Sequence, residues 1–101
     1  MDDELRKWVD DVLRNLADAL QEFGSYTFWD KGPDEVMYID GYASRLKSMP
    51  GEKAGKFLEA LGTVDGNKEA EHLASVILGQ CDDANDEWWE ACCSAAPSVE
   101  Y

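Results

Sequence analysis

The fold is decided first by residues 2–24, which read DDELRKWVDDVLRNLADALQEFG. Apolar residues recur there at steps of three and four, which places them on one stripe of a helix of about 20 residues. Acidic residues open the segment, where they favour the positive end of the helix dipole, and Gly24 is a natural stop. The predicted stripe consists of Leu5, Trp8, Val9, Val12, Leu13, Leu16, Ala19, Leu20 and Phe23.

Beyond this helix, residues 24–33 read as a connection that carries three aromatic side chains between two glycines. A second helix is expected from about Asp34 to Ser48, although Gly41 inside it costs on the order of 1 kcal/mol against alanine. Its predicted apolar face consists of Val36, Ile39, Tyr42, Ala43, Leu46 and Met49.

Three shorter helices are predicted in the second half of the chain. Pro50 suits the first turn of the third helix, Gly62 ends it, and Asn67 caps the fourth after the turn-forming pair Asp65 and Gly66. Asp82, Asp83 and Asn85 then interrupt the pattern, and Pro97 ends a short fifth helix. The predicted inward residues are Ala54, Phe57, Leu58 and Leu61, then Ala70, Leu73, Ala74, Ile77 and Leu78, then Trp88, Trp89, Cys92 and Cys93.

These segments predict one all-α domain over residues 1–101, a compact bundle of about five helices. Chain length supports a single core, because a domain of this size buries roughly two-thirds of the surface that its unfolded chain exposes. Short turns between the later helices favour antiparallel helix hairpins packed beside the long first helix. No convincing internal repeat accompanies this pattern.

The charge is strongly acidic, with 22 Asp and Glu against nine Lys and Arg, a net charge of −13. It is also uneven, because the stretch from Glu69 to Tyr101 holds eight acidic residues and no Lys or Arg. Direct binding to nucleic acid or to an anionic membrane is disfavoured, since both are bound through cations. A basic protein partner would instead be attracted.

The N-terminus and the cysteines bear on where in the cell the protein is expected. No segment approaches the roughly 20 apolar residues that span a membrane, and the acidic start is unlike a basic signal peptide. Three cysteines is an odd number, so we expect free thiols in a reducing cytoplasm.

For His72, Cys81, Cys92 and Cys93 the alternatives are a zinc site and simple packing. The closely paired Cys-x-x-Cys spacing is absent, and adjacent cysteines on a helix point about 100° apart. We therefore expect the cysteines to fill the core as small apolar residues, with neither a metal nor another cofactor.

The densest acidic run allows three interpretations, which are not exclusive. It lacks the alternating ligand loop of a calcium site, so a cation is the weakest of them. Helix capping and a docking surface for a basic partner are the other two. The run consists of Asp82, Asp83, Asp86, Glu87 and Glu90.

Two aromatic groups are candidates for partner contact. Tyr26, Phe28 and Trp29 either seal the edge of the core or form an interface, because Tyr and Trp are frequent interface hot spots. Trp88 and Trp89 are adjacent on a helix, so one of the two rings should be at least partly exposed beside the acidic run.

The leading functional hypothesis is a non-enzymatic binding module that docks on a basic, nucleic-acid-binding or nuclease-like partner and inhibits it. Immunity proteins and phage-coded inhibitors use the same physics, which is an analogy of charge and size and not a family match. The alternative is a helical adaptor that self-associates or packs on a helical partner through an exposed stripe on the first helix, widened by Trp8 and Leu16. Acidity that serves only solubility is a further possibility, and the oligomeric state is left open.

Overall fold

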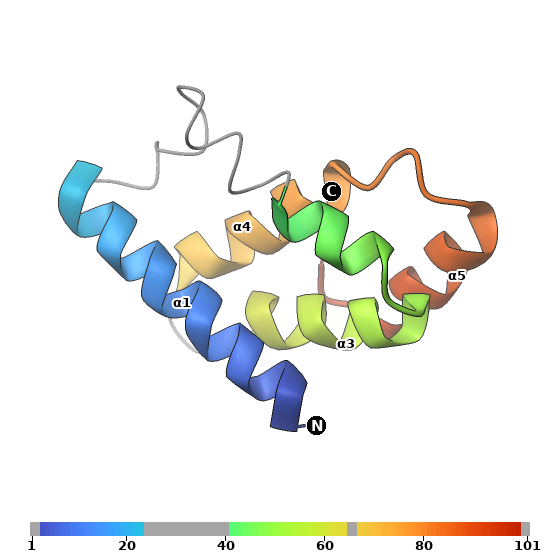
Figure 1. Cartoon of the computed structure of the whole chain (residues 1–101), viewed down its shortest axis with the longest axis horizontal. Helices are drawn as coiled ribbons and strands as arrows, with labels where there is room; N and C mark the ends of the chain where they lie inside the picture. The colour runs from blue at the N-terminus through green and yellow to red at the C-terminus, as the bar shows by residue number, and fades with distance from the viewer. Residues whose placement is uncertain (1–2, 24–40, 65–66, 100–101) are drawn as a thin grey trace.

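Every regular element in the described residues, which span 3–23, 41–64 and 67–99 of the computed structural model, is a helix. Four helices have defined bounds: α1 (Asp3–Phe23), α3 (Gly51–Gly62), α4 (Lys68–Gly79) and α5 (Asp86–Ala95). Residues 41–47 are helical as well. The arrangement in Figure 1 confirms the predicted all-α bundle with a long N-terminal helix.

Helix α1 buries the stripe that its sequence predicts. Leu5, Trp8, Val9, Val12 and Leu16 are each at most 6% exposed, and Leu13 is half-buried. The side chains of Ala19, Leu20 and Phe23 lie outside the described part of the chain, as do the connection 24–33 and residues 34–40 of the predicted second helix.

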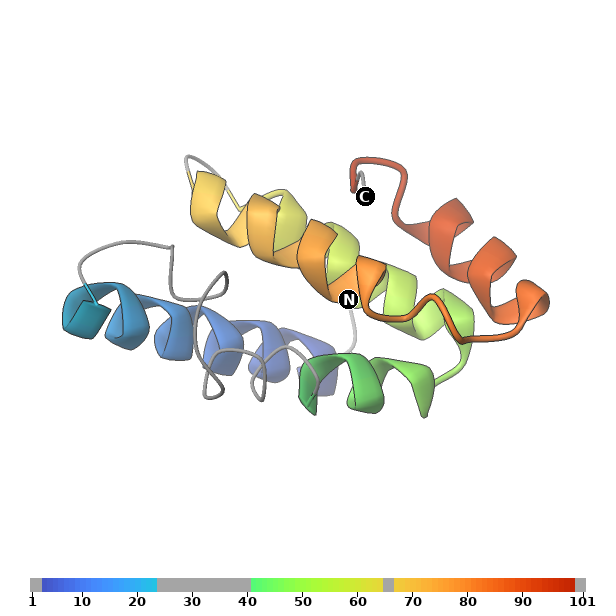
Figure 2. The same cartoon turned by 90° about the horizontal axis from the view of Figure 1, so that it is seen from above.

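Helix α3 occupies the centre of the bundle. It packs against α1, α4 and α5, and its residues Phe57, Leu58 and Leu61 are completely buried. Figure 2 shows α4 running back beside α3 as an antiparallel hairpin, with α1 and the helical residues 41–47 on one side and α5 on the other. Three neighbours therefore cover a helix of only 12 residues.

Asparagine caps fix the beginnings of α4 and α5. The Asn67 side chain accepts a hydrogen bond from the Ala70 amide at 3.0 Å, as predicted, and Asn85 accepts one from the Trp88 amide at 2.8 Å. One prediction shifts by a residue, because Pro50 occupies the N-cap position and α3 begins at Gly51. Its backbone is extended there, with ψ of 142°, and its carbonyl accepts the Ala54 amide.

Helix α5 packs on α3 in the same direction, although α4 lies between them in the sequence. A Cβ atom built on Gly51 would lie 2.5 Å from the Trp88 carbonyl oxygen and 2.9 Å from the Ala91 Cβ. One turn later, a Cβ on Gly55 would collide with the Cys92 carbonyl oxygen and lie 2.7 Å from the Ala95 Cβ. The two glycines thus permit a backbone approach that any larger residue would block.

Trp8 joins three elements of the bundle. Its ring stacks on Phe57 of α3 with centroids 3.8 Å apart and an interplanar angle of 17°. The guanidinium carbon of Arg45 lies 4.1 Å from the Trp8 ring centroid, which is cation–π geometry. Because Trp8 is 5% exposed, this stack fixes how α1 sits on the helices that follow it.

Candidate functional site

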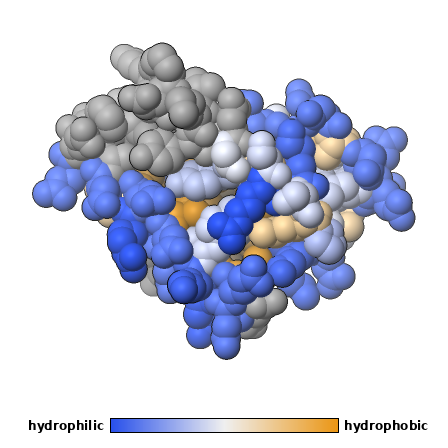
Figure 3. Space-filling model, viewed as in Figure 1, coloured by the Kyte–Doolittle hydropathy of each residue, from blue (hydrophilic) through white to orange (hydrophobic). Residues whose placement is uncertain are grey.

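The acidic run lies on a turn and on the outward side of the helix that follows it. Asp82 and Asp83 are in the turn 80–84, Asp86 and Glu87 are in the first turn of α5, and Glu90 follows on the same helix. All five side chains are exposed, and we call them the acidic surface. In Figure 3, the end of the molecule where α5 lies is mainly hydrophilic, with smaller hydrophobic areas between the hydrophilic residues.

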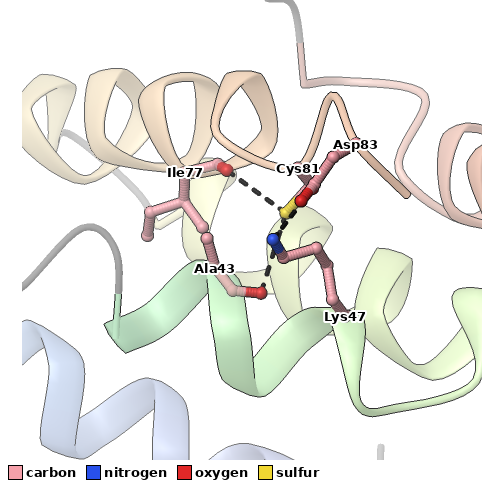
Figure 4. Close-up of polar contacts among 5 residues, drawn as sticks. All are labelled: Ala43, Lys47, Ile77, Cys81 and Asp83. Carbon is pink, nitrogen blue, oxygen red and sulfur yellow. Dashed lines mark hydrogen bonds and ion pairs between the residues drawn. The ribbon is translucent and has the colours of Figure 1, made fainter.

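Asp83 differs from the rest of the acidic surface, because it is already paired with a cation. The Lys47 ammonium donates a hydrogen bond of 2.8 Å to the Asp83 carboxylate (Figure 4). This hydrogen bond lowers the pKa of Asp83 and raises the pKa of Lys47. The net negative charge that the surface offers to a partner therefore rests mainly on Asp82, Asp86, Glu87 and Glu90.

Helix capping accounts for only part of the run. The N-cap of α5 is Asn85, while Asp86 and Glu87 stand in the first turn, where the helix dipole favours negative charge. Asp82 and Asp83 precede the cap and belong to the turn after α4, and Glu90 lies beyond the first turn. Their placement is consistent with a solvated surface or a docking surface.

The two adjacent tryptophans divide between core and surface. Trp88 is 8% exposed, and its indole N–H donates a hydrogen bond of 3.1 Å to the Met49 carbonyl oxygen. Trp89 is half-buried, and its ring meets that of Trp88 edge to face at 5.9 Å. Trp88 is therefore corrected from a partner-contact residue to a core residue, and Trp89 is the tryptophan available at the acidic surface. Tyr26, Phe28 and Trp29 lie outside the described residues.

The three cysteines are free thiols in different surroundings. Cys81 and Cys92 are completely buried, as packing predicts, whereas Cys93 is exposed. The expectation that Cys93 lies on or near the inner face is wrong, because it is rotated by about 100° from Cys92 around α5. Among the described residues no group of three or more His, Cys, Asp or Glu side chains could hold a metal ion, and His72 is exposed on α4.

Burial gives the two inner thiols a measurable pH signature. Desolvation raises the pKa of Cys81 to about 11 and that of Cys92 to about 12, above the ordinary value of 9.0. A raised thiol pKa stabilises the fold below pH 9, and this contribution is lost as the pH rises from 9 through the folded-state values.

The unfolding free energy should accordingly fall above pH 9, by up to about 1.4 kcal/mol per pH unit for each thiol. Urea denaturation at intervals between pH 8 and 10.5 measures this slope. A Cys92→Ala variant should show a shallower slope than the wild-type protein, because one of the two buried thiols is gone. Equal slopes in the two proteins would contradict the assignment to buried thiols.

The exposed stripe expected for a helical adaptor is absent from the described part of α1. Trp8 and Leu16, which the sequence predicts to widen this stripe, are only 5% and 2% exposed. The same residues that would attract a helical partner are used inside the chain, where Trp8 stacks on Phe57. The described part of α1 therefore gives the adaptor alternative no support, while the side chains of Leu20 and Phe23 lie outside it.

Comparison with known proteins identifies no relative from which a function could be inferred. No protein-family model, curated protein or solved structure matches this sequence. None of the helices in ranges 3–23, 41–64 and 67–99 is both long and apolar enough to cross a membrane.

Proposed function

We propose that this protein is a binding module that docks through its acidic surface on a basic surface of another protein. The observation that supports this most directly is the separation of roles on α5. Its inner side is filled by α3, with Trp88 and Cys92 buried, while its outer side presents Asp86, Glu87 and Glu90. The outward charges are thus not needed to hold the helix on the bundle.

Electrostatics favours a cationic partner. From Glu69 onward the sequence contains no Lys or Arg, and among the described residues Lys47 is the cation seen paired with the acidic surface. Closely spaced carboxylates of one sign create a field that raises the association rate of a basic protein, and salt weakens this field. Half-buried Trp89 supplies apolar contact area beside the charges.

Inhibition is the consequence we propose for a partner that binds nucleic acid. Such a partner uses its basic surface to neutralise phosphates. Carboxylates on α5 and the preceding turn would occupy those cations, so docking and nucleic-acid binding would exclude each other. The proposed activity is therefore competitive and needs no catalytic residue.

The proposal is tested by charge reversal at two exposed residues of α5, one turn apart. Asp86→Lys with Glu90→Lys changes the charge of the acidic surface and leaves the buried side of the helix intact. The matched control is Asp10→Lys with Asp18→Lys, which makes the same change in net charge at exposed positions of α1. Tagged proteins are used to capture partners from native lysate at low and high salt, followed by association kinetics.

We expect a basic partner that the wild-type protein and the α1 control retain at low salt and release at high salt. The α5 variant should lose it, with an association rate reduced by at least roughly tenfold at low salt. Nucleic acid should compete with the wild-type protein for that partner. Equal capture by the two double variants would remove the acidic surface from consideration.

A further inference from the structure

The joint between the helical residues 41–47 and the turn 80–84 has a buried side and an exposed side. On the buried side, the completely buried Cys81 thiol donates a hydrogen bond of 3.4 Å to the Ile77 carbonyl oxygen and lies 3.9 Å from that of Ala43. On the exposed side, Lys47 is paired with Asp83 at 2.8 Å. Figure 4 shows both contacts between the same two segments.

The two contacts lie close together along both segments. Lys47 follows Ala43 by one helical turn, and Asp83 follows Cys81 by two residues. The ion pair therefore bridges the two segments next to the point where the thiol meets the helix. The charge of Lys47 also acts on the Cys81 thiol and lowers its pKa against the larger effect of burial, which agrees with this proximity.

The turn itself is held locally by short-range hydrogen bonds. The Cys81 amide donates to Leu78 at 3.0 Å, and the Ala84 amide donates to Cys81 at 3.0 Å. The bond within the turn persists if the turn moves away from residues 41–47, and the bond to Leu78 keeps the turn attached to α4, whereas the Lys47–Asp83 pair must break. Asp83 is 70% exposed and Lys47 29% exposed, so dissolved ions reach the pair and screen it.

We propose that the Lys47–Asp83 ion pair is a salt-sensitive strap that holds the turn 80–84 against the helical residues 41–47 and thereby keeps the Cys81 thiol buried. When a dissolved cation or a cationic side chain of another molecule pairs with Asp83 in place of Lys47, the turn is released. The Cys81 thiol then becomes accessible to covalent modification. Occupancy of Asp83 and reactivity of Cys81 are thereby coupled. This device concerns the turn alone and stands whether or not the acidic surface binds a partner.

The test is the rate at which iodoacetamide alkylates each cysteine of the intact native protein, followed by peptide mass spectrometry. A buried thiol reacts only from an open form, so its rate reports the population of that form. The chain supplies its own references, because Cys93 is exposed and reports reagent activity. Cys92 is buried where α5 meets α3 and reports larger-scale unfolding.

Lys47→Met and Asp83→Asn should each accelerate alkylation of Cys81 by roughly two- to fivefold, the range for an exposed ion pair, with Cys92 unchanged. Raising NaCl to about 1 M should accelerate Cys81 in the wild-type protein and have little effect in either variant. The charge-swapped pair, Lys47→Glu with Asp83→Lys, should slow the reaction again. Lys56→Met is the matched control, since the ion pair of Lys56 among the described residues is with Glu52, within α3.

Two results would overturn the strap. Alkylation of Cys81 at the rate of Cys92 in every protein would mean that the turn opens only with the whole structure. A Cys81 rate that exceeds that of Cys92 but ignores both the variants and salt would mean that another contact closes the turn. The salt series on the wild-type protein decides the question even if a variant folds poorly.

Discussion

Gly55→Ala is expected to destabilise the protein by about 1–3 kcal/mol, the range for forcing an extra methyl group into a packed interior. The new Cβ would collide with the Cys92 carbonyl oxygen and approach the Ala95 Cβ to 2.7 Å. Because one of these atoms belongs to the backbone of α5, relief requires the two helices to separate. The steric cost must therefore exceed the gain of about 1 kcal/mol in helix propensity that alanine brings at an exposed helical site.

Gly79→Ala is the control for this prediction. A Cβ atom at Gly79 has nothing within 4 Å, so only the helix propensity changes, and the variant should be unchanged or more stable by up to about 1 kcal/mol. Urea denaturation followed by circular dichroism gives both free energies. Equal effects at Gly55 and Gly79 would show that α5 does not approach α3 as closely as the structure has it.

Phe57→Ala should cost about 3–5 kcal/mol, the usual range for removing a fully buried aromatic ring. That is a large fraction of the roughly 5–15 kcal/mol by which small domains are stable. Phe57 is completely buried at the centre of α3, and its loss would also remove the surface on which Trp8 stacks. The helix α1 would then lose its main aromatic contact with the core.

A double-mutant cycle with Trp8→Ala isolates the contact between the rings. The two losses should be non-additive by about 0.5–1.5 kcal/mol, since either substitution alone breaks the stack. Circular dichroism is the suitable signal, because Trp8 fluorescence changes with its surroundings. Lys56→Ala, at the exposed neighbour of Phe57, should change stability by less than about 0.5 kcal/mol. An additive cycle would place α1 elsewhere on the bundle.

Most of the helical architecture followed from local signals in the sequence. The three- and four-residue steps along α1 predicted which of its residues are buried, and Asn67 was identified as the cap of α4. Such signals are readable because a helix repeats every 3.6 residues and its unpaired amides need nearby acceptors. They predict the face that turns inward, without naming the neighbour that covers it.

For the candidate site, the sequence located the acidic run and predicted that one of two adjacent tryptophans would be exposed. It left open which of them, because both Trp88 and Trp89 lie near the inward face of α5. The choice depends on the Met49 carbonyl, 39 residues away in the chain, which accepts the Trp88 indole N–H. The pairing of Lys47 with Asp83 likewise joins residues 36 positions apart and had no sequence signal.

The sequence by itself thus determined the helices, most of their inward faces and the concentration of negative charge after residue 69. Tertiary structure decided that α3 is central and that α5 lies parallel to it, through the close approach at Gly51 and Gly55. It also decided that Cys93 faces outward and that one carboxylate of the acidic surface is paired. Periodicity and caps act within a few residues, whereas helix partners and cross-chain contacts depend on the fit of surfaces far apart in the chain.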